Sequence, residues 1–145
     1  MDTLRIYLAG PCRYEPDEGA AWRSKATEML NQVAEWRGAT VDVINPLSYF
    51  SYAENNHKTH KQVKSFYMDK IKHCDLLLVN LSGTDTSPGT AMEVQFASDH
   101  DIQSIGFGNE NIYPWLAEVD CQVVFQNLTE AINYIGDYYM GGTPQ

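Results

Sequence analysis

Residues 80–97, which read NLSGTDTSPGTAMEVQFA, combine a small polar loop with a carboxylate that is positioned to act on a ligand. The loop follows an apolar run at residues 76–79. The pattern therefore predicts a strand, a loop and then a helix that begins near Thr90. Glu93 would then lie in the first turn of this helix. Free backbone N–H groups at a helix start favour anions, so a carboxylate there stays ionised. Glu93 is therefore the leading candidate for a chemical role, and a stabilising charge at the helix end is the structural alternative.

Alternating strands and helices surround this stretch. The apolar pattern predicts strands at residues 4–9, 40–45, 75–81, 102–107 and 121–125, with a loop or short helix at 111–119. Helices are expected at residues 17–37, 60–72, 88–99 and 127–139. This alternation predicts an α/β fold, namely a flavodoxin-like, doubly wound sheet of five parallel strands in the order 2-1-3-4-5. We expect a single domain over residues 1–140 and a flexible tail over residues 141–145.

In this strand order, ligands bind at the switch point between the first and third strands, outside their carboxyl ends. The loops at residues 10–14 and 82–89 meet there, so the fold would bring Arg13 and Glu93 into one site. The candidate ligand-binding residues on the two loops are Gly10, Cys12, Arg13, Ser87, Gly89 and Thr90.

The composition limits the kinds of partner. The 145 residues include 10 basic and 19 acidic side chains, and the net charge of −9 argues against nucleic acid polymers. A small phosphorylated ligand needs only local donors and stays compatible with this charge. No signal peptide or membrane-spanning stretch is recognised, so we expect no membrane partner and a cytoplasmic location. Three unevenly spaced cysteines, Cys12, Cys74 and Cys121, are expected to be free thiols.

Several common cofactor motifs are absent from the sequence. No G-x-G-x-x-G follows the first strand, and no G-x-x-x-x-G-K-[ST] occurs, which argues against dinucleotide and P-loop sites. His57 and His60 have a spacing that metal pairs use, but they lie beside lysines and lack a third ligand. We interpret them as solvated surface residues, and we expect neither a metal nor an organic cofactor.

Three segments together resemble the nucleoside 2-deoxyribosyltransferase superfamily, which includes deoxynucleoside 5′-monophosphate N-glycosidases and cytidylate hydrolases. They are IYLAGP at residues 6–11, CDLLLVNL at 74–81 and SPGTAMEVQFA at 87–97. The resemblance covers about residues 4–107 and is weaker towards the C-terminus. It implies that Glu93 is a nucleophile that attacks the anomeric carbon of the sugar and forms a covalent glycosyl-enzyme, with Tyr7 beside it. A base or water would then accept the sugar.

The resemblance also bears on the substrate. Nucleoside transferases commonly carry an aspartate six residues before the glutamate, where this chain has Ser87, as the monophosphate N-glycosidases do. A serine beside helix-start amides suits phosphate, whereas an aspartate would repel it. Arg13 resembles a residue that those hydrolases place near the 5′-phosphate, and a surface arginine is its alternative interpretation. Together Ser87 and Arg13 favour nucleoside 5′-monophosphates, although Asp85 could serve a nucleoside if the loop shifts.

One position departs from the family pattern. The family usually has an aspartate four residues before Ile71, where this chain has Tyr67. Asp69 lies two residues later, about 200° around a helix, so we expect Tyr67 to face the pocket and Asp69 to face solvent. A tyrosine can donate a hydrogen bond but is a poor base at neutral pH. This departure keeps open a second hypothesis, a non-catalytic module that binds a nucleotide or nucleoside.

The resemblance further implies a homo-oligomer, at least a dimer, in which a neighbouring subunit completes the site. Candidates for the donated residue are Asn111, Tyr113 and Trp115. An aromatic loop is also expected to stack on or cover the base through Tyr49, Phe50 and Tyr52.

Overall fold

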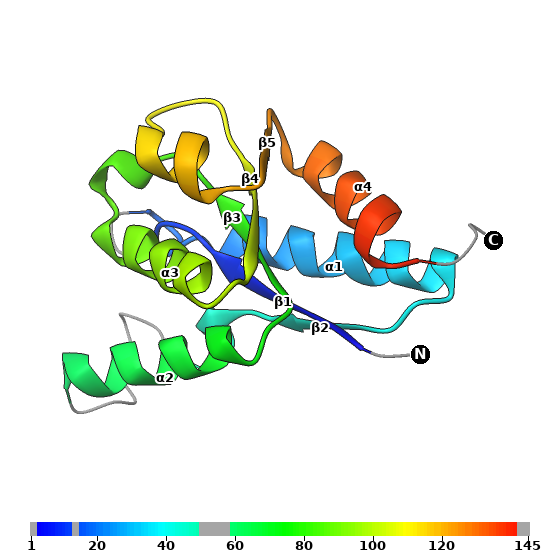
Figure 1. Cartoon of the computed structure of the whole chain (residues 1–145), viewed down its shortest axis with the longest axis horizontal. Coiled ribbons are helices and arrows are strands. Elements are labelled where there is room, and N and C mark those ends of the chain that lie inside the picture. Colours follow the sequence, from blue (N-terminus) through cyan, green and yellow to red (C-terminus); the bar gives the residue numbers. More distant parts are fainter. Residues whose placement is uncertain (1–2, 13–14, 50–58, 142–145) are drawn as a thin grey trace.

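The computed structural model describes residues 3–12, 15–49 and 59–141. Five parallel strands form one sheet in the order β2-β1-β3-β4-β5, which confirms the predicted fold (Figure 1). The strands are β1 (Leu4–Ala9), β2 (Val41–Ile44), β3 (Leu76–Asn80), β4 (Gln103–Phe107) and β5 (Val123–Phe125). Strands β2 to β5 are one to two residues shorter at one or both ends than the apolar runs that predicted them, a difference typical of element ends.

The helices of the described chain are α1 (Ala20–Arg37), α2 (His60–Lys72), α3 (Pro88–Asp99) and α4 (Leu128–Tyr139). Three short helical turns, η1 (Pro46–Ser48), η2 (Thr84–Thr86) and the π-helical η3 (Leu116–Asp120), lie in the connections. The predicted bounds of α2 and α3 are confirmed, and Asn127 caps α4 by accepting the Glu130 N–H at 2.9 Å. No described helix combines the length and apolarity that crossing a bilayer requires.

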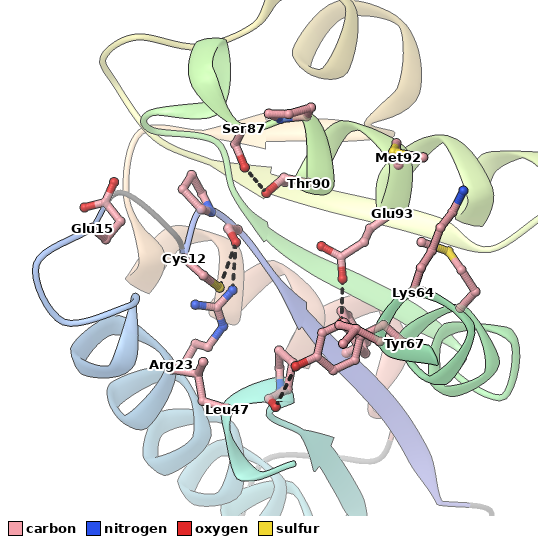
Figure 2. A pocket seen from close by; sticks show the side chains of 18 of the residues that line it. Cys12, Glu15, Arg23, Leu47, Lys64, Tyr67, Ser87, Thr90, Met92 and Glu93 are labelled. Atoms are coloured by element: carbon pink, nitrogen blue, oxygen red, sulfur yellow. Dashed lines mark hydrogen bonds between the residues drawn. The ribbon is translucent and has the colours of Figure 1, made fainter. Parts of the chain in front are cut away.

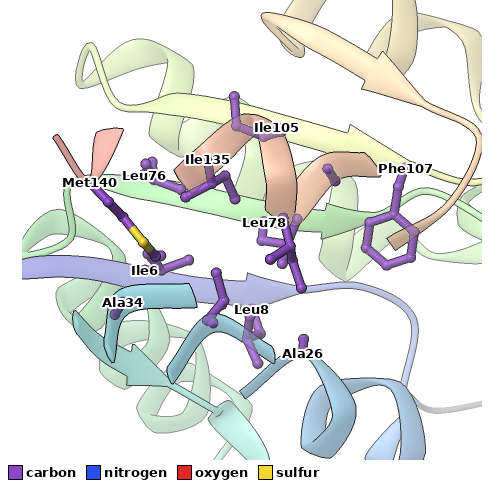
Figure 3. Packing of buried hydrophobic residues seen from close by; sticks show 13 residues of the cluster. Ile6, Leu8, Ala26, Ala34, Leu76, Leu78, Ile105, Phe107, Ile135 and Met140 are labelled. Carbon is purple, nitrogen blue, oxygen red and sulfur yellow. The ribbon is translucent and has the colours of Figure 1, made fainter. Parts of the chain in front are cut away.

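Each face of the sheet has its own hydrophobic core, because successive residues of a strand point to opposite faces. On β1, Ile6 and Leu8 pack with residues of α1 and α4, as Figure 3 shows. Tyr7 and Ala9 point the other way and pack with residues of α2, α3 and η3. The central strands therefore carry long apolar runs, since both of their faces are covered.

Helix α1 begins at Ala20, three residues later than the sequence pattern predicted. Glu18 and Gly19 have φ values of 58° and 79°, which a right-handed helix cannot include. Asp17 caps the helix instead of belonging to it, since its carboxylate accepts the N–H groups of Gly19 and Ala21, each at 2.9 Å. The prediction of a helix from residue 17 was therefore wrong, and residues 15–19 form part of a turn beside the site.

Helix α3 begins at Pro88, whose fixed φ suits the first helical position. Glu93 is the sixth residue of the helix, so it lies in the second turn, and the prediction that it lies in the first turn was wrong. The helix starts two residues before Thr90, and this places Glu93 farther along α3, above β1. The carboxylate and the free amides of the helix start thus occupy different positions, and each is available for a different part of a ligand.

Candidate functional site

A pocket of about 650 Å³ opens at the carboxyl ends of β1 and β3, at the predicted switch point. Its walls come from the loop after β1, the η1 turn, one face of α2 and the first two turns of α3 (Figure 2). The structure brings most of the predicted site residues to this pocket, namely Tyr7, Gly10, Cys12, Tyr67, Ser87, Gly89, Thr90 and Glu93. Arg13 lies outside the described residues.

Glu93 and Tyr7 form the polar centre of the pocket. The Tyr7 hydroxyl donates a hydrogen bond of 2.5 Å to Oε2 of Glu93, joining α3 to the middle of β1. Burial raises the pKa of Glu93 to about 7, and the opposing effects of the Tyr7 hydrogen bond and the Arg23 charge are smaller. Burial, and then the Glu93 charge, hold the pKa of Tyr7 well above its usual value, so Tyr7 stays a donor. A carboxyl group poised near neutrality is a feature of catalytic sites.

The start of α3 offers a second polar region beside Glu93. Ser87 does not cap the helix with its side chain, and its hydroxyl instead pairs with the Thr90 hydroxyl at 2.7 Å (Figure 2). Gly89 has open space where a side chain would project. Within the described chain, the first amide of α3 with a backbone acceptor is that of Ala91, which bonds to the Ser87 carbonyl. The preceding amides of Gly89 and Thr90 thus remain available to an anion.

The loop after β1 forms the wall opposite α3. Gly10 is buried, and a Cβ there would come within 3.0 Å of the Trp22 ring and 3.1 Å of the Asn80 Cβ. Cys12 is partly buried, and its thiol lies 3.5 Å from the Gly10 carbonyl. Burial raises the pKa of Cys12, so the thiol stays neutral at pH 7.

Helix α2 contributes Tyr67, and the expected division of its faces is confirmed. Tyr67 lines the pocket, whereas the Asp69 side chain is 70% exposed and lies near His73. The Tyr67 hydroxyl donates a 3.3 Å hydrogen bond to the Pro46 carbonyl, which directs it towards the η1 turn. Asp85 is exposed and does not line the pocket.

The other candidates lie away from the described pocket. Tyr49 is 41% exposed and packs against Phe66, while Phe50 and Tyr52 fall outside the described residues. Tyr113 and Trp115 border a separate groove between α2, α3 and η3. Asn111 adopts a left-handed φ of 52° and accepts the Asp85 N–H through its carbonyl.

The sequence analysis missed three basic residues that line the pocket: Arg23, His60 and Lys64. His60 was interpreted as a surface residue; it is exposed, but it borders the pocket opening together with Lys64 one turn later. Arg23 carried a signal that was available, because it falls in phase with the buried residues Ala26 and Leu30 on α1. An arginine on an apolar stripe indicates either an internal ion pair or a functional site.

No group of three His, Cys, Asp or Glu side chains in the part of the chain that the structure describes could hold a metal ion. Of the residues described around the pocket, Glu93 and Glu15 carry carboxylates, and Glu15 is exposed at the rim. The described side chains of the pocket therefore offer one partly buried carboxylate, two phenols and the two cations Arg23 and Lys64. This set suits attack at an electrophilic carbon next to a bound anion.

Known proteins resemble this chain in sequence pattern and in fold. The family model of nucleoside 2-deoxyribosyltransferases matches residues 6–129. The chain is similar to a 2-deoxyribosyltransferase from Bacillus psychrosaccharolyticus, with 20% identity, a TM-score of 0.70 and coverage of 97% and 98% of the two chains.

Two further solved structures share the fold. For a 2-desoxiribosyltransferase from Leishmania mexicana, the identity is 21%, the TM-score is 0.65 and the coverage is 94% of this chain and 99% of the other. For a CMP N-glycosidase from Clostridium botulinum, the corresponding values are 23%, 0.55, 92% and 99%. The comparison with curated protein sequences gave no match.

Proposed function

Because the chain belongs to the nucleoside 2-deoxyribosyltransferase family, we propose that it cleaves the N-glycosidic bond of 2′-deoxyribonucleosides or their 5′-monophosphates. The observation that carries this proposal is the 2.5 Å hydrogen bond between Tyr7 and Glu93 inside the switch-point pocket. It holds one carboxylate oxygen and leaves the other free to face a ligand.

In the proposed reaction, the free oxygen of Glu93 attacks C1′ of the sugar. The C1′–N bond breaks, its electron pair leaves with the base, and an ester forms between C1′ and Glu93. A second base or water then attacks C1′ and releases the carboxylate. Tyr7 keeps the carboxylate oriented and, because its pKa is well above the usual value, it remains a neutral donor throughout. No metal or organic cofactor is needed for this sequence of steps.

The 5′ end of the substrate is proposed to bind at the start of α3. The hydroxyls of Ser87 and Thr90 and the amides of Gly89 and Thr90 are donors grouped at a helix N-terminus, where a phosphate is favoured. The first turn of α3 contains no acidic residue that would repel a phosphate. This set of donors favours a 5′-monophosphate over an unphosphorylated nucleoside. Arg13 would add a further cation from the loop after β1.

The proposed assembly is a homo-oligomer in which a neighbouring subunit lies against the groove beside the pocket. This groove has a volume of about 590 Å³ and shares Lys64, Met68 and Met92 with the pocket. Trp115 and Val119 near it are 69% and 74% exposed, which is unusual for large apolar side chains. Light scattering on the purified protein tests this: a Trp115→Glu variant should shift the species towards monomer.

The activity is tested by incubating the protein with a panel of deoxynucleosides and deoxynucleoside 5′-monophosphates, with and without an acceptor base. We expect release of free base, fastest for a monophosphate. The matched variant Glu93→Gln should reduce release by at least about a thousandfold, as expected when a nucleophile is removed. Mass spectrometry after rapid quenching should find the deoxyribosyl group on the Glu93 peptide. A panel in which no compound loses its base would contradict the proposal.

A non-catalytic binding module is the second candidate. It is favoured by one observation: the Tyr67 hydroxyl, at the position of the family aspartate, is directed to the Pro46 carbonyl. Glu93→Ala separates the two functions. If the protein is an enzyme, the variant loses turnover and still binds the nucleotide. If it is a binding module, the wild type shows no turnover and the variant changes only the affinity for the nucleotide. Calorimetry measures this affinity.

A further inference from the structure

Arg23 is a buried cation beside the pocket, and no acidic side chain of the described residues forms an ion pair with it. Its residue is 1% exposed, and in the described chain no carboxylate lies within ion-pair distance of its guanidinium. A buried arginine without an acidic partner is costly unless carbonyl groups or a functional charge compensate it. Figure 2 shows Arg23 beneath Cys12, on the α1 side of the pocket and across it from Glu93.

The guanidinium binds the two ends of the loop that joins β1 to α1. Its Nη2 donates 2.8 Å to the Gly10 carbonyl, directly after β1. Its Nη1 donates to the carbonyls of Glu18 and Gly19, at 3.2 and 3.3 Å, directly before α1. One side chain therefore closes a loop whose residues 10–12 and 15 line the pocket. A planar guanidinium with donors on two sides can do this, whereas an ammonium group cannot span both ends.

The backbone of the loop between β1 and α1 packs closely against the Arg23 side chain. Gly19 has a φ of 79°, and a Cβ at this position would lie 2.2 Å from Nη1 of Arg23 and 2.9 Å from the Pro11 carbonyl. The left-handed conformation turns the Gly19 carbonyl towards the guanidinium while keeping the backbone close to it. The close packing fixes the guanidinium at one position relative to the pocket.

We propose that Arg23 is a positioning residue of the site, which fixes the loop after β1 against the pocket and supplies the permanent positive charge that Glu93 faces. This inference rests on the proposed function, because it assigns Glu93 the ionised form that attack on the sugar requires. Arg23 lines the pocket, but its guanidinium donates to backbone carbonyls, so we assign it no direct contact with the substrate. It acts through the loop and through its charge.

Other titratable groups line the same pocket as Glu93. They are Tyr7 on β1, Cys12 and Glu15 on the loop, Arg23 on α1, and His60, Lys64 and Tyr67 on α2. Burial raises the pKa of Glu93, the Tyr7 hydrogen bond lowers it, and the Arg23 charge lowers it further. Lys64 lies at the exposed rim, where water and salt screen its charge. Arg23 is enclosed by protein, so its charge is screened less and acts over a longer distance.

The effect of the Arg23 charge on the pKa of Glu93 is tested by NMR titration of the Glu93 carboxyl carbon. The titration uses the free protein and requires no substrate. Arg23→Gln should raise the midpoint by roughly 0.5 to 1 pH unit relative to wild type. Arg37→Gln is the matched control, because Arg37 lies on the same helix but pairs with Asp137 away from the pocket, and it should leave the midpoint unchanged. An unchanged midpoint in a folded Arg23→Gln protein would overturn the electrostatic role.

The positioning of the loop by Arg23 is tested with Arg23→Lys. This variant keeps the positive charge and should retain the fold more readily than Arg23→Gln. Alkylation of Cys12 by a thiol reagent, followed by mass spectrometry, should become at least about threefold faster, while the buried Cys74 keeps its rate. A Cys12 rate equal to that of wild type would overturn the positioning role. Both measurements are independent of turnover. An inactive protein with the expected titration and alkylation changes would refute the proposed function and support this inference.

Discussion

Glu93 carries a carboxyl group whose burial opposes the charge that attack on a sugar requires. Its pKa of about 7 reflects this conflict, since desolvation outweighs the hydrogen bond from Tyr7 and the charge of Arg23. The two opposing contributions come from residues 86 and 70 positions away in the sequence. At the residue scale, opposing contributions therefore set the pKa of Glu93. A single substitution in the site changes either the stability of the protein or the ionisation of Glu93.

The first prediction concerns stability. Because the pKa of Glu93 is raised from 4.5 to about 7, the folded state binds more protons than the unfolded state between these values. The contribution of Glu93 to the free energy of unfolding is therefore largest below about pH 4.5. It is lost as pH rises through about 7, by about 3 kcal/mol at most. Glu93→Gln does not titrate, so its free energy of unfolding should exceed that of wild type at pH 8 by more than at pH 5. Urea unfolding at both pH values measures this.

In that comparison the other carboxyl groups cancel, because they are the same in both proteins. Equal differences between variant and wild type at pH 5 and pH 8 would show that Glu93 has an ordinary pKa.

The second prediction concerns the Tyr7 hydroxyl. Tyr7→Phe removes the hydrogen bond that lowers the pKa of Glu93, so this pKa should rise by about 1 unit. The acid limb of kcat/KM for base release should lie near pH 7 in wild type and near pH 8 in the variant. Activity at pH 7 should fall about fivefold, because the ionised fraction of Glu93 falls by this factor, and it should recover at pH 9. A limb at the same pH in both proteins would mean that Tyr7 does not control the ionisation of Glu93.

At the scale of elements, α3 separates two tasks along one helix. Pro88 begins the helix and leaves the amides of Gly89 and Thr90 at its free end, while Glu93 projects from the second turn over β1. The spacing of one turn, about 5.4 Å, keeps an anion at the helix start apart from the carboxylate. Ser87 lies at the junction and bears no charge, so this helix can accept a phosphate at one end and present a nucleophile from its side.

The third prediction follows from this separation. Ser87→Asp adds a negative charge at the start of α3, so it should lower kcat/KM for deoxynucleoside 5′-monophosphates by at least about tenfold. Unphosphorylated deoxynucleosides should lose much less, and the ratio of the two kcat/KM values measures the preference. Ser87→Ala is the control for the loss of the hydroxyl alone. Equal losses for both substrate classes would place the phosphate elsewhere.

At the scale of the whole molecule, the sheet divides the protein into a supporting face and a functional face. Helices α1 and α4 cover one face and form a core with Ile6, Leu8 and Leu78. The other face carries Tyr7 and Leu77 under α2 and α3, and the pocket opens at its edge. In a chain whose net charge is −9, the pocket is lined by two basic residues, Arg23 and Lys64, and by two acidic residues, Glu15 and Glu93.

The fourth prediction compares the two faces. Leu77 and Leu78 are adjacent, both 0% exposed, and point to opposite faces of β3. Leu77→Ala and Leu78→Ala should each lower the free energy of unfolding by about 2 to 5 kcal/mol. Only Leu77→Ala should also reduce kcat, because Leu77 pairs with Tyr7 in the sheet and packs on the same face. Urea unfolding and base release below the unfolding transition measure both effects, and equal kcat values would contradict the assignment.

Apolar periodicity and turn residues are local properties, so the sequence predicted the sheet order and the bounds of α2 and α3. Most of the predicted site residues line the pocket, but they make up less than half of its lining. The sequence also predicted which face of α2 carries Tyr67. It misplaced the start of α1, since the left-handed conformations of Glu18 and Gly19 depend on contacts with Arg23 and Pro11. It missed Arg23 itself, although this arginine falls in phase with Ala26 and Leu30, because the carbonyls that bind its guanidinium are brought together only in the fold.

The amino-acid sequence was thus sufficient to identify the motif around Glu93 and the family to which the chain belongs. The ionisation of Glu93, the direction of the Tyr67 hydroxyl and the closure of the β1–α1 loop were decided by the tertiary structure. The physical reason is that these properties depend on burial and on groups brought together from distant positions. A sequence pattern specifies which residues share a face, but desolvation and hydrogen bonding across the pocket exist only in the packed fold.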